Sequence, residues 1–229
     1  MSTQYGVIHG ATRIREHMAS YTKQIVDALH SILCDGTPGP GPKGKTTGDD
    51  PWTGAILSAL AKCRQQNGFV DYKHHCAKAL THKSLLFDQL WVEYNNEGNI
   101  VDFPLIAESE LNGDKKWRIG EQREDFEKLL AANASYRLFI CQLDPANHLK
   151  EVMGDVENDL LDKLTALLET YRRAHMGDVF LIVIMQYRRA VRYLKYRELV
   201  CGHSGWVHRD DIRNCSQQAL TNQSSTKTH

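Results

Sequence analysis

The segment that most constrains the fold is residues 101–111, an apolar run that ends in two glutamates. Side chains alternate between the two faces of a strand, so Ile106, Glu108 and Glu110 are expected on one face of a sheet. Two carboxylates on the same face repel each other, and partial desolvation strengthens the repulsion. A bound divalent cation would relieve it, because hard cations prefer oxygen ligands. The alternative is a pair of solvated glutamates at an exposed strand end.

The segments on either side of this strand predict an α/β fold. Residues 85–94 are expected to form the preceding strand, since the sequence Asn-Asn-Glu-Gly-Asn at 95–99 is a strong turn signal. A helix is predicted at 124–133 and a strand at 136–143, which closes a β-α-β unit with parallel pairing. The uninterrupted apolar run at 180–185 is typical of a strand that is buried on both faces.

Helical spacing of apolar residues predicts three further helices, at 10–34, 51–67 and 146–174. The apolar face of the last helix is either core or the surface of a homodimer. We expect a single α/β domain over residues 1–214, with its core at about 52–186 and a mixed central sheet flanked by helices. A flexible loop is predicted at 35–50 and a disordered tail at 215–229.

Composition gives no overall preference for a charged partner. The chain has 229 residues, and its 28 Lys and Arg balance its 28 Asp and Glu, so nucleic-acid binding would need local segregation of charge. No apolar run approaches the roughly 20 residues that span a bilayer, and no secretory signal is evident. We therefore expect no membrane partner and a cytoplasmic location. The six cysteines show no framework spacing and are expected to be reduced thiols.

A third carboxylate precedes the turn. Asp88 lies in an apolar stretch at 85–91, where an unpaired charge is costly. If the turn pairs the two strands, Asp88, Glu108 and Glu110 gather on one sheet surface, a layout that can hold one or two Mg²⁺ ions against a phosphodiester. Taken alone, Asp88 fits a metal ligand and a purely structural residue equally well, the latter at a strand end or as the partner of a helix cap.

The order of Asp88, Glu108-x-Glu110, a helix and a strand resembles the PD-(D/E)xK superfamily, the restriction-endonuclease-like nucleases. Three sequences are similar to a bacterial branch of this fold: Phe-Asp-x-Leu-Trp at 87–91, Pro-Leu-Ile-Ala-Glu-Ser-Glu at 104–110 and Glu-Asp-Phe-Glu-Lys-Leu-Leu at 124–130. The resemblance covers about residues 52–142. It implies a restriction-endonuclease-like three-layer core, with a mixed central sheet between helices.

The resemblance also implies a metal-dependent phosphodiesterase, a nuclease that acts on DNA or RNA through a metal-activated water. Asp88, Glu108 and Glu110 would hold Mg²⁺ or Mn²⁺, although Glu110 stands where the family usually has lysine and only a minority of relatives carry glutamate. Lys128 would be a relocated catalytic lysine, and Glu16 an added carboxylate from the first helix. The alternative for Lys128 is an exposed helix lysine. The alternative function is a catalytically inactive member that binds nucleic acid or a protein partner.

The segment 172–197 mixes basic and aromatic residues, which is typical of contacts to phosphates and bases. The candidate nucleic-acid-binding residues are Arg188, Arg189, Arg192, Lys195 and Arg197. The alternative is a solvated helix face that pairs with the acidic stretch 151–162.

Two other motifs are weaker. Residues 39–46 match the P-loop pattern GxxxxGK[ST], but the preceding segment is helical by period and two prolines remove backbone N–H donors. Cys201, His203, His208 and Cys215 could be assembled into a zinc set, but their spacing matches no common structural site.

Overall fold

The computed structural model describes residues 21–36, 51–71, 87–111, 119–142, 153–171, 173–186 and 192–215. Several predictions fall outside these ranges and are not addressed by the structure. They concern the start of the first helix with Glu16, most of the loop at 35–50 with the P-loop match, and the tail after Cys215.

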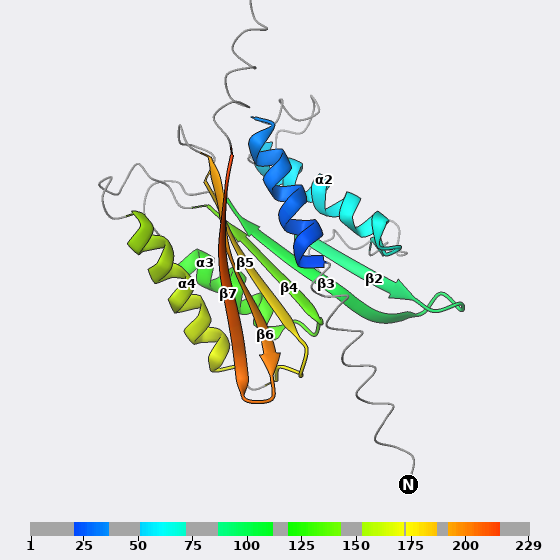
Figure 1. The fold of residues 1–229 in the computed structure, drawn as a ribbon. Helices are drawn as coiled ribbons and strands as arrows, with labels where there is room; N and C mark the ends of the chain where they lie inside the picture. Colours follow the sequence, from blue (N-terminus) through cyan, green and yellow to red (C-terminus); the bar gives the residue numbers. More distant parts are fainter. Residues whose placement is uncertain are drawn as a thin grey trace, which may run out of the picture.

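Two helices come first in the described chain, and strands and helices alternate only from β3 to β5 (Figure 1). A helix covers residues 21–34. It is followed by α2 (Pro51–Gln66), β1 (Val70–Asp71), β2 (Gln89–Tyr94), β3 (Ile100–Glu110), α3 (Ile119–Ala131), β4 (Tyr136–Cys141), α4 (Met153–Glu169), β5 (Val179–Gln186), β6 (Tyr193–Gly202) and β7 (Gly205–Asn214).

The described strands form one mixed sheet in which the spatial order follows the order along the chain. β3, β4 and β5 run parallel to one another, and the crossover helices α3 and α4 connect them. The other neighbouring strands pair antiparallel. The predicted β-α-β unit and the hairpin at 95–99 are therefore confirmed, and the fold is α/β with a mixed central sheet.

The sheet lies between two layers of helices. The helix at 21–34 and α2 pack on one face, and α3 and α4 pack on the other (Figure 1). β4 and β5 are buried along their whole length. In β5, Leu181 and Val183 point into the first core, whereas Phe180 and Ile182 point into the second. A strand covered on both faces has a continuous apolar sequence, which is why this run predicted a central strand.

Short sequence signals set the boundaries of two connections. Pro51 opens α2, where its missing N–H costs no helical hydrogen bond. Gly68 follows the end of α2 with a φ of 75°, a left-handed conformation that favours glycine. Between β2 and β3, the Asn95 side chain accepts hydrogen bonds from the backbone N–H groups of Glu97 and Asn99 at 3.0 and 2.9 Å. This side-chain turn closes the hairpin.

The structure decides between alternatives at two places in the second half of the chain. The basic segment after β5 does not form a helix face: its described part, together with the residues that follow, forms β6 and β7. The described apolar face of α4 belongs to the core, which confirms the first of the two alternatives for that face, and a homodimer stays a prediction. The buried apolar residues of that helix are Leu160, Leu161, Leu164 and Leu168. Within the described residues, no helix is long and apolar enough to cross a membrane, and a cytoplasmic location stays a prediction.

The expectation that all cysteines are reduced is corrected. Cys34 and Cys215 form a disulfide across a sequence separation of 181. Cys63, Cys141 and Cys201 are free. The two bonded cysteines share no local pattern, because one ends a helix and the other follows the last strand.

Arg137 carries a positive charge into the core beneath α3 and α4, where its exposed fraction is 2%. Its guanidinium donates to the Ala132 carbonyl at 3.0 Å and to the Asp178 carboxylate at 3.2 Å, and it lies 5.8 Å from the centre of the Tyr171 ring. Asp178 also accepts a hydrogen bond from the His175 N–H at 3.0 Å. This ion pair therefore joins the connections that lead into β4 and β5.

We predict that Asp178→Ala lowers the free energy of unfolding by about 3–5 kcal/mol, because it leaves the Arg137 charge buried without its partner. Asp159→Ala is the matched control, since it breaks a half-exposed pair with Lys163 and should cost no more than about 0.5 kcal/mol. Urea denaturation of both variants measures the difference. Equal losses would show that the buried pair does not stabilise the fold.

Candidate functional site

Asp88 and Glu108 lie beside each other at the face of the sheet that carries α3. β2 pairs antiparallel with β3 so that Gln89 faces Ala107, which brings Asp88, one residue before β2, beside Glu108. The Asp88 carboxylate accepts hydrogen bonds from the Ser109 N–H at 2.8 Å and the Ser109 hydroxyl at 2.6 Å. The hairpin therefore sets the positions of both carboxyl groups, as its turn sequence predicts.

Glu108 is a buried carboxyl, with an exposed fraction of 4%. It shares its face of β3 with Ile106, as side-chain alternation predicts. The pKa of this carboxyl is raised from 4.5 to about 8, mainly by burial and secondly by the negative charges of Asp88 and Asp125. The positive charge of Lys128 lowers the pKa but does not offset these causes. Among the described residues, its Oε1 atom has no hydrogen-bond partner. A cation would stabilise such a group, because it would replace the proton that the buried carboxyl otherwise keeps.

α3 brings two charged side chains to this pair. Lys128 forms an ion pair with Asp125, three residues before it in α3. The hydrogen bond to Asp125 is the main cause that raises the pKa of Lys128, and the charges of Glu108 and Asp88 add to it. Asp88, Glu108, Asp125 and Lys128 together form what we call the carboxylate–lysine cluster. Sequence reasoning did not single out Asp125, although its i, i+3 spacing from Lys128 was an available signal.

Glu110 lies on the same strand, two residues after Glu108, but the structure does not bring three carboxylates to one point. Asp88, Glu108 and Glu110 are not a group whose possible ligand atoms all lie within 4.8 Å of one another. The role of Glu110 as a metal ligand therefore stays a prediction. The carboxylate–lysine cluster contains Asp88 and Glu108 but not Glu110.

The predicted nucleic-acid-binding residues Lys195 and Arg197 are buried, each with an exposed fraction of 6%. The Lys195 ammonium lies 3.7 Å from the Glu157 carboxylate. The Arg197 guanidinium lies 2.7 Å from each of the Asp162 and Asp210 carboxylates. Glu157 and Asp162 belong to α4 and Asp210 belongs to β7. The basic residues therefore pair with the acidic stretch 151–162, as the alternative stated, but they do so from a strand and not from a helix. Neither cation is available to a phosphate backbone.

Arg192 is also used within the fold, since it donates to the Leu33 carbonyl at 3.3 Å. Arg188 and Arg189 lie outside the described residues. The predicted basic surface is therefore left without support from its described members.

No protein-family model, curated protein or solved structure matches this chain. The functional interpretation consequently comes from the residues of the carboxylate–lysine cluster and from their surroundings.

The raised pKa of Glu108 predicts that the fold loses stability as the pH rises. The carboxyl has a pKa of about 8 when folded and an ordinary value of 4.5, so between these values the folded state holds a proton that the unfolded state has lost. The stabilisation is complete below about pH 4.5 and disappears as the pH rises through about 8. Urea denaturation across this range, without divalent ions, measures it.

Glu108→Gln should flatten this pH profile, because an amide does not titrate. Glu97→Gln, in the exposed turn between β2 and β3, should leave the profile unchanged. Parallel profiles for the wild-type chain and Glu108→Gln would contradict the raised pKa.

Proposed function

We propose that this protein is a Mg²⁺-dependent phosphodiesterase with a restriction-endonuclease-like fold, which cleaves DNA or RNA. The observation that carries the proposal is Glu108, a buried carboxyl with an unpartnered oxygen beside Asp88 and Lys128. Burying a carboxyl in this way is costly, and structural roles rarely require it. Asp88 is exposed and shares the same electrostatic environment, so a cation from solvent would reach the pair from the Asp88 side.

Asp88 and Glu108 fit Mg²⁺ as its two protein ligands. Mg²⁺ commonly binds through one or two carboxylates and fills its other positions with water and substrate phosphate. The Glu108 Oε1 atom and the Asp88 carboxylate supply oxygen donors from two neighbouring strands. When bound, Mg²⁺ lowers the pKa of a coordinated water and stabilises charge on the attacked phosphate.

Lys128 supplies the positive charge that the family usually takes from the position of Glu110. Its ion pair with Asp125 holds the ammonium on the side of α3 that interacts with Glu108 and Asp88. A fixed ammonium there would stabilise the negative charge that develops on phosphate oxygens in the transition state. A lysine on a helix rather than on β3 is what the family resemblance implies for Lys128.

Glu110 also supports a second candidate, a non-catalytic member of the fold that binds nucleic acid or a protein partner. A glutamate at this position repels phosphate, whereas the usual lysine attracts it. The two functions differ in turnover, so one assay separates them.

We predict metal-dependent cleavage of plasmid or oligonucleotide substrates in Mg²⁺ or Mn²⁺. Asp88→Asn and Glu108→Gln should each abolish it, because they remove the anionic oxygen donors while keeping the side-chain shapes. Lys128→Met should slow cleavage by about 10²-fold, the usual effect of losing one group that stabilises transition-state charge. Gel assays of initial rates measure all three effects.

Asp102→Asn is the matched control, since Asp102 is an exposed carboxylate on the same strand, and this variant should cleave at the wild-type rate. Binding of nucleic acid that survives Asp88→Asn and Glu108→Gln, with no turnover in either metal, would support the non-catalytic function instead.

Mg²⁺ affinity should rise with pH up to about 8, the pKa of Glu108, because the ion must displace the proton from this carboxyl. Calorimetric titration in buffers of different ionisation enthalpy measures both the affinity and the proton released. Binding that is independent of pH between 6 and 8 would exclude Glu108 as a ligand.

A further inference from the structure

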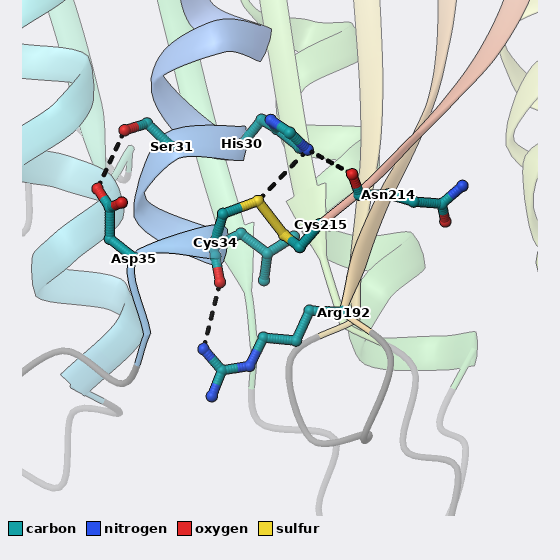
Figure 2. The surroundings of a disulfide bond; sticks show 8 residues. His30, Ser31, Cys34, Asp35, Arg192, Asn214 and Cys215 are labelled. Carbon is teal, nitrogen blue, oxygen red and sulfur yellow. Dashed lines mark hydrogen bonds between the residues drawn. A yellow bond between two sulfur atoms is a disulfide. The ribbon is translucent and has the colours of Figure 1, made fainter. Parts of the chain in front are cut away.

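His30, Cys34 and Cys215 meet where the helix at 21–34 ends beside the end of β7 (Figure 2). His30 and Cys34 are one helical turn apart, and Cys215 directly follows β7. In Figure 2 the His30 ring points at the sulfur of Cys34, which is bonded to Cys215. This is the one set of three His, Cys, Asp or Glu in the described residues whose possible ligand atoms lie within 4.8 Å of one another.

We propose that the reduced form of this disulfide binds Zn²⁺ through His30, Cys34 and Cys215. Thiolates and imidazoles are the ligands that Zn²⁺ prefers, unlike the oxygen donors of the carboxylate–lysine cluster. The proposed zinc site is therefore independent of the proposed nuclease function. It also differs from the set of Cys201, His203, His208 and Cys215 that the sequence offers.

The distance between the first two donors already suits a tetrahedral zinc ion. The Nε2 atom of His30 lies 3.4 Å from the Sγ atom of Cys34, and two donors at ordinary Zn–N and Zn–S lengths lie about 3.5 Å apart at a tetrahedral angle. The two sulfurs must separate to about 3.8 Å once their bond is broken, which rotation of cysteine side chains permits. The fourth position is left for water or another ligand.

The site does not depend on the disulfide for its assembly. The helix at 21–34 is anchored by buried Ile25, Leu29 and Leu33. Asp27 also joins this helix to the sheet independently of the sulfurs, through its ion pair with Arg213 of β7. The His30 Nε2–H donates to the Asn214 carbonyl at 3.3 Å in the disulfide form, and it gives up this hydrogen bond when Nε2 binds the ion.

The segment before β6 adds two more links to this region. Arg192 donates to the Leu33 carbonyl at 3.3 Å, and the Cys215 N–H donates to the Arg192 carbonyl at 3.0 Å. These contacts hold both ends of the site in place, so reduction leaves two thiols and an imidazole close together.

The exchange between the two forms is chemically balanced. A thiol reductant breaks the sulfur–sulfur bond: two electrons and two protons convert the disulfide into two thiols, and the reductant leaves as its own disulfide. Zn²⁺ then displaces both thiol protons, since thiolates are its ligands. His30 binds as the neutral imidazole. A purely structural disulfide needs no histidine beside it, whereas a zinc site uses one as a third ligand. A reducing compartment would favour the metal form, and an oxidising one the disulfide.

The test uses the full chain, reduced with a thiol, freed of reductant without oxygen, and titrated with Co²⁺ and then Zn²⁺. We expect one Co²⁺ per reduced chain at this site, counted by thiolate charge-transfer bands in the near ultraviolet and by the visible bands of a tetrahedral site. Zn²⁺ should displace the Co²⁺ and remove the bands. The oxidised chain should bind neither ion at this site.

Cys34→Ser and Cys215→Ser should lose these bands, whereas Cys201→Ser, which alters a free cysteine of β6, should keep them. His30→Ala keeps both cysteines, and therefore the disulfide, and should lower Zn²⁺ affinity at least about tenfold. Circular dichroism and thermal melting of each variant show whether it is folded. Asp88→Asn should leave the bands unchanged, which separates this site from the proposed nuclease site.

Three results would overturn the proposal. One is a reduced chain that shows no thiolate bands with Co²⁺ and binds no Zn²⁺ at this site. Another is wild-type Zn²⁺ affinity both in His30→Ala and in Cys34→Ser or Cys215→Ser, each measured as a single variant. The third is a Cys34–Cys215 bond that survives excess reductant in the folded protein, as a thiol count would show.

Discussion

Burial of β4 and β5 on both faces is the constraint that places the other elements of this fold. Each strand directs apolar side chains alternately into two cores, and burying that surface gains about 25 cal/mol per Å² only where helices cover it. Right-handed crossovers between parallel strands bring α3 and α4 to the same face. The helix at 21–34 and α2, which precede the strands in the chain, must then cover the opposite face.

The same two-sided burial produces the carboxylate–lysine cluster. β3 lies next to β4, so the side chains that it directs toward α3 enter a core, and Glu108 follows Ile106 on that side. A carboxyl in this position keeps its proton up to about pH 8 unless a cation takes the proton's place. Asp88, at the start of the next strand out, stays exposed. A buried and an exposed carboxyl therefore lie side by side, which suits the capture of a divalent ion from solvent.

Ion pairing explains why the basic segment does not form the expected surface. β6 directs Lys195 and Arg197 toward α4, and a charge buried there is costly without a partner. Glu157 and Asp162 of α4 supply the partners from one side, and Asp210 of β7 supplies another. Composition alone does not distinguish a cation that binds phosphate from one that attaches a helix to a sheet, because both use the same residue types.

The sequence by itself determined the α/β class, the β-α-β unit and the faces of β3, since helical spacing and strand alternation are local properties of the chain. The turn at 95–99 likewise placed Asp88 on the strand beside Glu108. Only the tertiary structure decided which distant residues meet: Asp125 with the two carboxylates, Lys195 with Glu157, and His30 and Cys34 with Cys215. Such contacts depend on how whole elements pack against a shared sheet. Even the disulfide, which spans 181 positions, therefore leaves no signal in the residues around either cysteine.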